Sequence, residues 1–198
     1  MISEPMTLAT DYLLAAVTAA AGVLTLTATG GQASRRAWAG AFIALALGAA
    51  LGGTHHGFRL EPLWLPTVMV IGVASAAMLA GSAFATTRGA LRRFLVALAL
   101  VKLALFWAWV WRDDRFIWVV ADTGLAFVLV ALLHAMRWRS RGSGAILAGV
   151  ALSVAAGLVQ ASGLDLHRHF NHNDLYHLIQ MVAIVAYYRG VRQLADFG

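Results

Sequence analysis

The chain has 198 residues, of which 61% are hydrophobic and 12% are charged, and it contains no cysteine. This charged share is about half that of a soluble domain, so the composition is typical of an integral membrane protein. Without cysteine, disulfides, thiolate metal sites and cysteine nucleophiles are excluded, and any metal needs nitrogen and oxygen ligands. The net charge of +6 does not indicate a nucleic-acid partner, because the arginines form short clusters between apolar segments.

Seven apolar segments predict an all-α, polytopic membrane protein. A helix needs roughly 20 residues to cross the hydrocarbon core of a bilayer, and seven segments reach or approach this length. They cover residues 12–29, 37–55, 63–85, 94–111, 116–136, 145–161 and 175–188. The connections are short, so we expect one domain, residues 1–198, folded as a seven-transmembrane-helix bundle. The first segment begins beside Asp11 and lacks a signal-peptide pattern, so it is expected to be a retained span.

The arginines predict the orientation of the bundle. Four of them, Arg59, Arg112, Arg115 and Arg168, fall on one side of the seven segments and ten on the other. By the positive-inside rule, the N-terminus is then outside and the C-terminus is cytoplasmic. The chain is rich in arginine and alanine and shows no evident targeting peptide, so we expect a bacterial inner membrane. The ten cytoplasmic arginines are Arg35, Arg36, Arg88, Arg92, Arg93, Arg137, Arg139, Arg141, Arg189 and Arg192.

Six of the seven histidines gather on the outer side, although they come from two distant parts of the chain. They are His55 and His56 at the end of the second segment, and His167, His169, His172 and His177 around the start of the seventh. Asp122 lies about two turns below the outer end of the fifth segment, at a depth comparable with His177. We therefore expect one outer pocket to gather His56, His177 and Asp122.

Such a pocket suits metal-assisted hydrolysis. Zinc held by three protein ligands polarises a water in its open fourth position, and a nearby carboxylate can take or deliver protons. Asn173 and His177 share a helix face, whereas His172 and His177 diverge by about 140° on one helix. No HExxH motif accompanies these residues. Asn171 or Asn173, together with Asp174, is favoured as the cap of the seventh helix.

This layout resembles the CREST superfamily of membrane hydrolases, which includes the alkaline ceramidases and adiponectin-receptor-like proteins. The resemblance covers the topology of the whole chain: seven spans, a histidine at the end of the second, and a histidine-rich entrance to the seventh. It implies that three histidines bind Zn²⁺ and that the protein hydrolyses a lipid amide or ester drawn from the membrane.

Carried over to this sequence, the resemblance implies His56 and His177 as zinc ligands. Asn173 stands at the family's third ligand position, so His172 would take its place, with His55 and His169 as alternative ligands. The residue that moves the proton would be Asp122 or Asp174.

Lys102, the only lysine of the chain, leaves other functions open. A buried lysine beside Asp122 could carry a retinal Schiff base, but opsin-like families place that lysine in the seventh span. An ion pair between Lys102 and Asp122 on neighbouring antiparallel helices is favoured instead. His56 and His177 could also ligate haem or pass a metal or protons. A non-enzymatic receptor, transport protein or metal- or haem-binding protein is therefore the alternative to the hydrolase.

Overall fold

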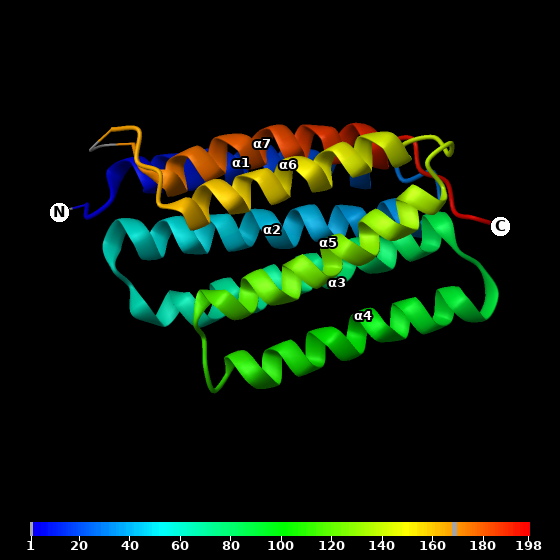
Figure 1. The fold of residues 1–198 in the computed structure, drawn as a ribbon, viewed down its shortest axis with the longest axis horizontal. Coiled ribbons are helices and arrows are strands. Elements are labelled where there is room, and N and C mark those ends of the chain that lie inside the picture. The colour runs from blue at the N-terminus through cyan, green and yellow to red at the C-terminus, as the bar shows by residue number, and fades with distance from the viewer. Residues whose placement is uncertain (1, 168–169) are drawn as a thin grey trace.

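Seven long α-helices joined by short turns make up most of the computed structural model, which describes residues 2–167 and 170–198 (Figure 1). A single turn of 3-10 helix, η1 (Glu61–Leu63), precedes α3. Within the described ranges there is no β-strand, so the predicted all-α class is confirmed. The helices are α1 (Pro5–Leu26), α2 (Ala33–Phe58), α3 (Trp64–Thr86), α4 (Gly89–Val110), α5 (Phe116–Met136), α6 (Ser143–Ser162) and α7 (His172–Val191).

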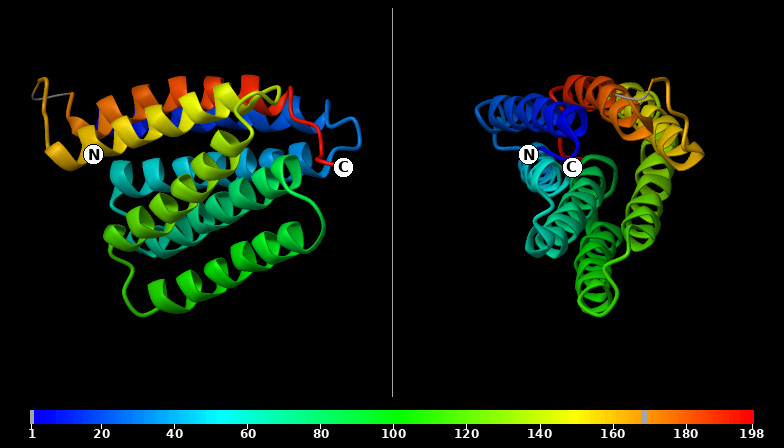
Figure 2. Two further views of the ribbon diagram at one scale, coloured as in Figure 1. Left: turned by 45° about the vertical axis from the view of Figure 1, so that its right-hand side comes forward. Right: turned by 90° about the vertical axis from the view of Figure 1, so that its left-hand side faces the viewer.

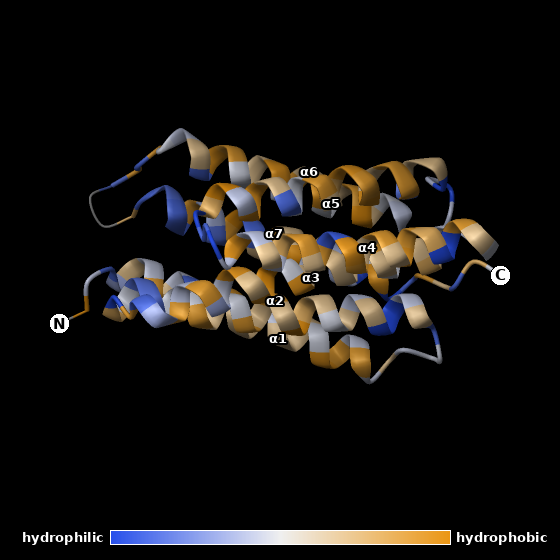
Figure 3. Ribbon diagram, turned by 90° about the horizontal axis from the view of Figure 1, so that it is seen from below, coloured by the Kyte–Doolittle hydropathy of each residue, from blue (hydrophilic) through white to orange (hydrophobic). Residues whose placement is uncertain are grey.

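The helices have the length and hydrophobicity of membrane spans. Six of those described, α1 to α6, are long and apolar enough to cross a bilayer. Figure 3 shows long hydrophobic stretches along the helices, with hydrophilic residues mainly towards their ends. Large apolar side chains face outward, such as Phe94 at 63% and Leu105 at 67% exposure on α4. Such a surface requires an apolar surrounding, so the prediction of a membrane-embedded helical protein is confirmed at this level.

Six helices form a closed ring and α4 lies outside it (Figure 2). Around the ring, α1 packs on α2, α2 on α3, α3 on α5, α5 on α6, α6 on α7, and α7 returns to α1. α4 packs chiefly against α3. The first and last helices are therefore neighbours. As a result, the beginnings of α1 and α7 and the end of α2 lie together at one end of the bundle, here called the N-terminal end.

Aromatic side chains and small residues fill the ring interior. The ring centroids of Trp38 on α2 and Tyr187 on α7 are 5.3 Å apart, and those of Trp38 and Phe42 are 6.0 Å apart. Gly149 of α6 and Gly81 of α3 make room for them, because a Cβ atom would lie 2.6 Å from the Tyr187 ring and 2.5 Å from the Trp38 ring, respectively. Close packing at small residues is how membrane helices associate, since lipid is as apolar as the side chains themselves.

Replacing Trp38 tests this core. Trp38→Ala leaves a cavity against Phe42 and Tyr187 and is expected to lower the free energy of unfolding by about 3–5 kcal/mol. The matched control is Trp138→Ala, whose side chain is 64% exposed beyond the end of α5; we expect a change below about 0.5 kcal/mol. Unfolding by SDS titration in detergent micelles, followed by circular dichroism, measures both. Equal effects of the two variants would contradict the assigned core.

Candidate functional site

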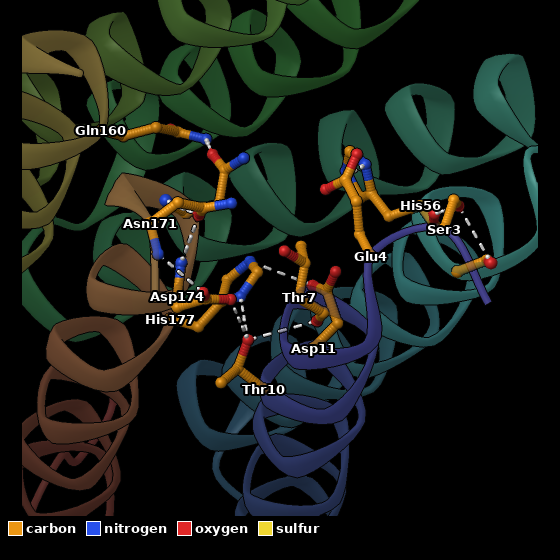
Figure 4. Close-up of polar contacts among 12 residues, drawn as sticks. Ser3, Glu4, Thr7, Thr10, Asp11, His56, Gln160, Asn171, Asp174 and His177 are labelled. Carbon is orange, nitrogen blue, oxygen red and sulfur yellow. Dashed lines mark hydrogen bonds and ion pairs between the residues drawn. The ribbon is translucent and has the colours of Figure 1, made fainter. Parts of the chain in front are cut away.

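Buried polar side chains of α1 and α7 meet at the N-terminal end of the bundle (Figure 4). Thr10 and Asp11 lie on the second turn of α1, and His177 lies on the second turn of α7. His177 Nε2 is 3.1 Å from Asp11 Oδ1, and His177 Nδ1 is 2.9 Å from Thr10 Oγ1. The three residues are 5–6% exposed. Both nitrogens of a buried imidazole are therefore engaged by the neighbouring helix.

Asp174 joins this network and also begins α7. Its Oδ1 accepts a hydrogen bond from Thr10 Oγ1 at 3.2 Å, and its Oδ2 accepts one from the Asn171 amide at 2.9 Å. Asn171 Oδ1 accepts from the amides of Asn173 and Asp174, which completes a capping box. The predicted capping of the seventh helix is confirmed, with Asn171 as the N-cap. We call Thr10, Asp11, Asp174 and His177 the terminal cluster.

The hydroxyl of Thr10 makes the proton positions of this cluster interdependent. Three acceptors lie within reach of its single proton: Asp174 Oδ1, His177 Nδ1 and the carbonyl of Thr7 at 3.2 Å. If Thr10 donates to Asp174, its oxygen accepts a hydrogen bond from a protonated His177 Nδ1. The lone pair of His177 Nε2 then faces Asp11. If Thr10 donates to Nδ1, then Nε2 carries a proton and donates it to Asp11. One arrangement of heavy atoms thus accommodates two arrangements of protons.

Asp11 has a carboxylate oxygen that is free to bind a ligand. Its Oδ2 is buried and has no hydrogen-bond partner in the described part of the chain. α2 approaches Asp11 closely at Gly53, where a Cβ atom would lie 2.7 Å from Asp11 Cβ. An unsatisfied buried acceptor costs about 1–3 kcal/mol, so this oxygen is a natural ligand for a proton, a water or a metal ion. Sequence analysis identified Asp11 only as the residue at the start of the first span and predicted no functional role for it.

His56, a predicted zinc ligand, stands beside the terminal cluster. Its Nδ1 is 4.0 Å from Glu4 Oε2, and its side chain is 31% exposed. The Ser3 hydroxyl donates to the carbonyl of His56 at 2.6 Å, which ties the N-terminal segment over the end of α2. The charge of His56 acts on His177, and in Figure 4 Glu4 and His56 lie on the side of Asp11 that faces away from His177. His56 is therefore only partly buried, unlike the four residues of the terminal cluster.

His172, the other predicted ligand, is engaged elsewhere. Its Nδ1 lies 2.9 Å from Asp165 Oδ1 in the loop between α6 and α7. Hydrogen bonds from the His172 side chain and backbone hold the pKa of the Asp165 carboxyl below its usual range. The alternative ligand His169 lies outside the described residues. Within residues 2–167 and 170–198, no group of three His, Asp or Glu side chains is arranged to hold a metal ion. His56 and His177 thus lie at the same end of the bundle, and His172 is bound to Asp165.

Asp122 belongs to a separate buried group where α4 packs against α3 and α5. Lys102 Nζ on α4 donates to Asp122 Oδ1 on α5 at 2.5 Å and to Ser75 Oγ on α3 at 2.7 Å. Ser75 donates in turn to Asp122 Oδ2 at 2.5 Å. The favoured ion pair of Lys102 and Asp122 is confirmed. We call these three residues the central cluster.

The predicted pocket of His56, His177 and Asp122 is therefore not formed. Among the described residues, the side-chain polar contacts of Asp122 are to Lys102 and Ser75 rather than to either histidine. Asp122 lies about two turns from the start of α5, but its depth alone could not predict which neighbouring helix its side chain faces. Ser75 was missed because a serine in an apolar helix carries no signal of its own.

Comparison with known proteins assigns the chain to a family without assigning a function. It belongs to a family of unknown function, DUF6962, whose profile matches residues 6–196. No curated protein and no solved structure matches the chain. The resemblance to the CREST superfamily therefore stays a prediction.

The central cluster yields a stability prediction. Lys102→Met leaves the carboxylate of Asp122 buried without its counter-ion, and we expect a loss of about 3–5 kcal/mol in the free energy of unfolding. Lys102→Met combined with Asp122→Leu removes both charges and should recover most of that loss. SDS titration of the single and double variants measures the difference. A double variant as unstable as Lys102→Met would show that the pair contributes through packing rather than charge.

Proposed function

We propose that this protein spans the membrane seven times, with its N-terminus outside and its C-terminus in the cytoplasm of a bacterial cell, and hydrolyses a membrane lipid amide or ester at the terminal cluster. The observation that carries this proposal is the buried pair of Asp11 and His177. The Oδ2 atom of Asp11 has no hydrogen-bond partner among the described residues and lies where three helices meet. The arginine count supports the orientation.

The N-terminal end of the bundle offers donor atoms for a zinc ion, but they come from a different set of residues than the sequence predicted. Asp11 and His177 are adjacent and buried, Asp11 Oδ2 has no described partner, and His56 is the nearby second imidazole. Two imidazoles and one carboxylate are a donor set of catalytic zinc sites. We therefore propose Asp11, His56 and His177 as ligands, with Asp11 in the place given to His172. No three-ligand site is preformed among the described residues, so the proposal requires these side chains to turn towards one another on binding.

The partners of His177 support a ligand role for its Nε2 atom. Metal-binding histidines usually donate their other ring N–H to an acceptor that fixes the tautomer and the ring orientation. Here Nδ1 faces Thr10 Oγ1, which is itself within hydrogen-bond reach of Asp174. With Thr10 donating to Asp174, Nδ1 holds the proton and the Nε2 lone pair is directed to the side of Asp11. Asp174 is then a positioning residue.

Proton transfer is assigned to a carboxylate near the solvent. When bound, zinc would supply a polarised water for attack on the substrate carbonyl. Asp122, one of the predicted proton carriers, is paired with Lys102 in the central cluster and is not available. Glu4 lies 4.0 Å from His56 and its side chain is 43% exposed, so it can exchange protons with water. We assign the proton transfer to Glu4.

Exposed apolar side chains around the terminal cluster favour a lipid as the substrate. Tyr12 and Leu13 on α1, Phe58 at the end of α2 and Leu166 before α7 are 44–60% exposed. The Tyr12 hydroxyl is held 2.9 Å from Thr54 Oγ1 on α2, so its ring covers the seam between the two helices. A hydrocarbon chain can lie on this surface while its polar linkage reaches the helix ends.

Proton handling without a metal is the second candidate. It is favoured by the two proton arrangements that Thr10 and His177 permit in one set of atomic positions. A relay of this kind is a common use of buried carboxylates and histidines in membrane proteins. In this case the cluster serves a transport or receptor protein. A haem between His56 and His177, the remaining alternative, is recognised by a visible absorption band that zinc lacks.

Metal content separates the two candidates. Elemental analysis of detergent-purified protein is expected to give about one zinc ion per chain in the wild type. Asp11→Asn and His177→Ala should lose the metal, and with it the hydrolysis of a panel of lipid amides and esters. His172→Ala is the matched control and should keep both. Size-exclusion chromatography verifies that each variant is folded.

Two results would count against this assignment. A folded, metal-free wild type would refute the zinc-dependent hydrolase and leave the proton relay. Loss of zinc in His172→Ala with retention in Asp11→Asn would restore the ligand set inferred from the sequence.

A further inference from the structure

Three arginines converge on the C-terminal residues at the end of the bundle opposite the terminal cluster. The guanidinium of Arg137, which follows α5, lies 3.7 Å from the centroid of the Phe197 ring, and that of Arg88, which precedes α4, lies 5.6 Å from it. Arg92 donates a hydrogen bond to the carbonyl of Phe197. The Phe197 amide donates to the carbonyl of Phe84 at 2.9 Å, so the tail is fixed to the end of α3.

Asp196 anchors the tail and forms no ion pair with Arg88 or Arg137 among the described residues. Its two carboxylate oxygens accept hydrogen bonds from the amides of Ala33 and Ser34 at the start of α2, both at 2.8 Å. Burial raises the pKa of Asp196, but these hydrogen bonds and the positive charge of Arg92 outweigh burial and hold the pKa below its ordinary value. In the described part of the chain, the ion pairs do not include Arg88, Arg92 or Arg137. Arg88 and Arg137 thus stand together without an ion-pair partner in the described part of the chain, whereas Arg92 lies within the electrostatic reach of Asp196.

A groove opens beside these arginines towards the lipid. Its volume is about 210 Å³, and it runs between the end of α3, the start of α4 and the end of α5. Leu91, Leu133 and Met136 line it, and Met136 is 75% exposed. Arg88 and Arg137 line the same groove at the helix ends. Apolar side chains beside two cations at the helix ends match the polarity of a phospholipid, with its acyl chain next to a charged head group.

We propose that this groove binds an anionic phospholipid of the leaflet at the C-terminal end, with its phosphate between Arg88 and Arg137. An acyl chain lies on Leu91, Leu133 and Met136. Phe197 stacks on the face of the Arg137 guanidinium and leaves the N–H edge free for phosphate oxygens. Basic pockets between membrane helices bind anionic head groups in this way, because phosphate and guanidinium pair in charge-assisted hydrogen bonds. The site is independent of the proposed hydrolase.

Lipid binding to the full chain tests the proposal. Native mass spectrometry in detergent would titrate the wild type with phosphatidylglycerol and with phosphatidylcholine. The test variant is Arg88→Gln with Arg137→Gln. The control is Arg139→Gln with Arg141→Gln, which removes the same charge at the same end, outside the groove. We expect preference for phosphatidylglycerol in the wild type and control, and roughly 10- to 30-fold weaker binding of it in the test variant.

Three outcomes would overturn the proposal. Equal weakening in the test and control variants would reduce the effect to general surface charge. Equal affinity for the two lipids would remove the role of the guanidinium pair. Full displacement of the lipid by millimolar inorganic phosphate would show that the apolar groove contributes nothing. If the double variant does not fold, Arg88→Gln and Arg137→Gln are compared singly with Arg139→Gln, and each should weaken binding several-fold.

Discussion

Polar groups inside a lipid-facing bundle must find their partners within the protein, and the architecture of this chain depends on that constraint. The terminal cluster joins α1 to α7, and the central cluster joins α3, α4 and α5. A third bridge forms where His134 of α5, fully buried, lies 3.2 Å from Ser82 of α3 and 3.0 Å from Ser143 of α6. Apolar packing alone would not select these neighbours, because lipid competes equally for apolar surface. The polar bridges therefore specify which helices are adjacent.

α7 shows how the closed ring protects a helix that is poorly suited to lipid. It is the one long helix among those described that does not meet the hydrophobicity expected of a span. Its polar residues Asp174, His177 and Gln180 are at most 6% exposed, since they face the neighbouring helices. Packing between α1 and α6 thus allows α7 to keep polar side chains on its buried face. The same packing of α7 on α1 brings the terminal cluster together.

Hydropathy located all seven helices, because long apolar segments have few alternatives in a membrane. It was less accurate at the helix ends that carry the chemistry. Residues 12–29 were predicted where α1 spans Pro5–Leu26, and 175–188 where α7 spans His172–Val191. The omitted turns contain Asp11 and Asp174, whose polarity resembles that of a loop although both face inward. The contact of the first helix with the last is not encoded in any local pattern. The pairing of Lys102 with Asp122 was predictable, since consecutive antiparallel helices place them at similar depth.

The position of α4 outside the ring has a consequence for biosynthesis. Lys102 enters the membrane in a helix that packs chiefly on α3, and an unpaired lysine at mid-helix costs about 2.5–3.5 kcal/mol on insertion. Ser75 precedes it into the membrane on α3, whereas Asp122, twenty positions further along, enters only with α5. The full compensation becomes available only when the next helix arrives. The central cluster therefore links the final packing of α4 to the order in which the helices enter the membrane.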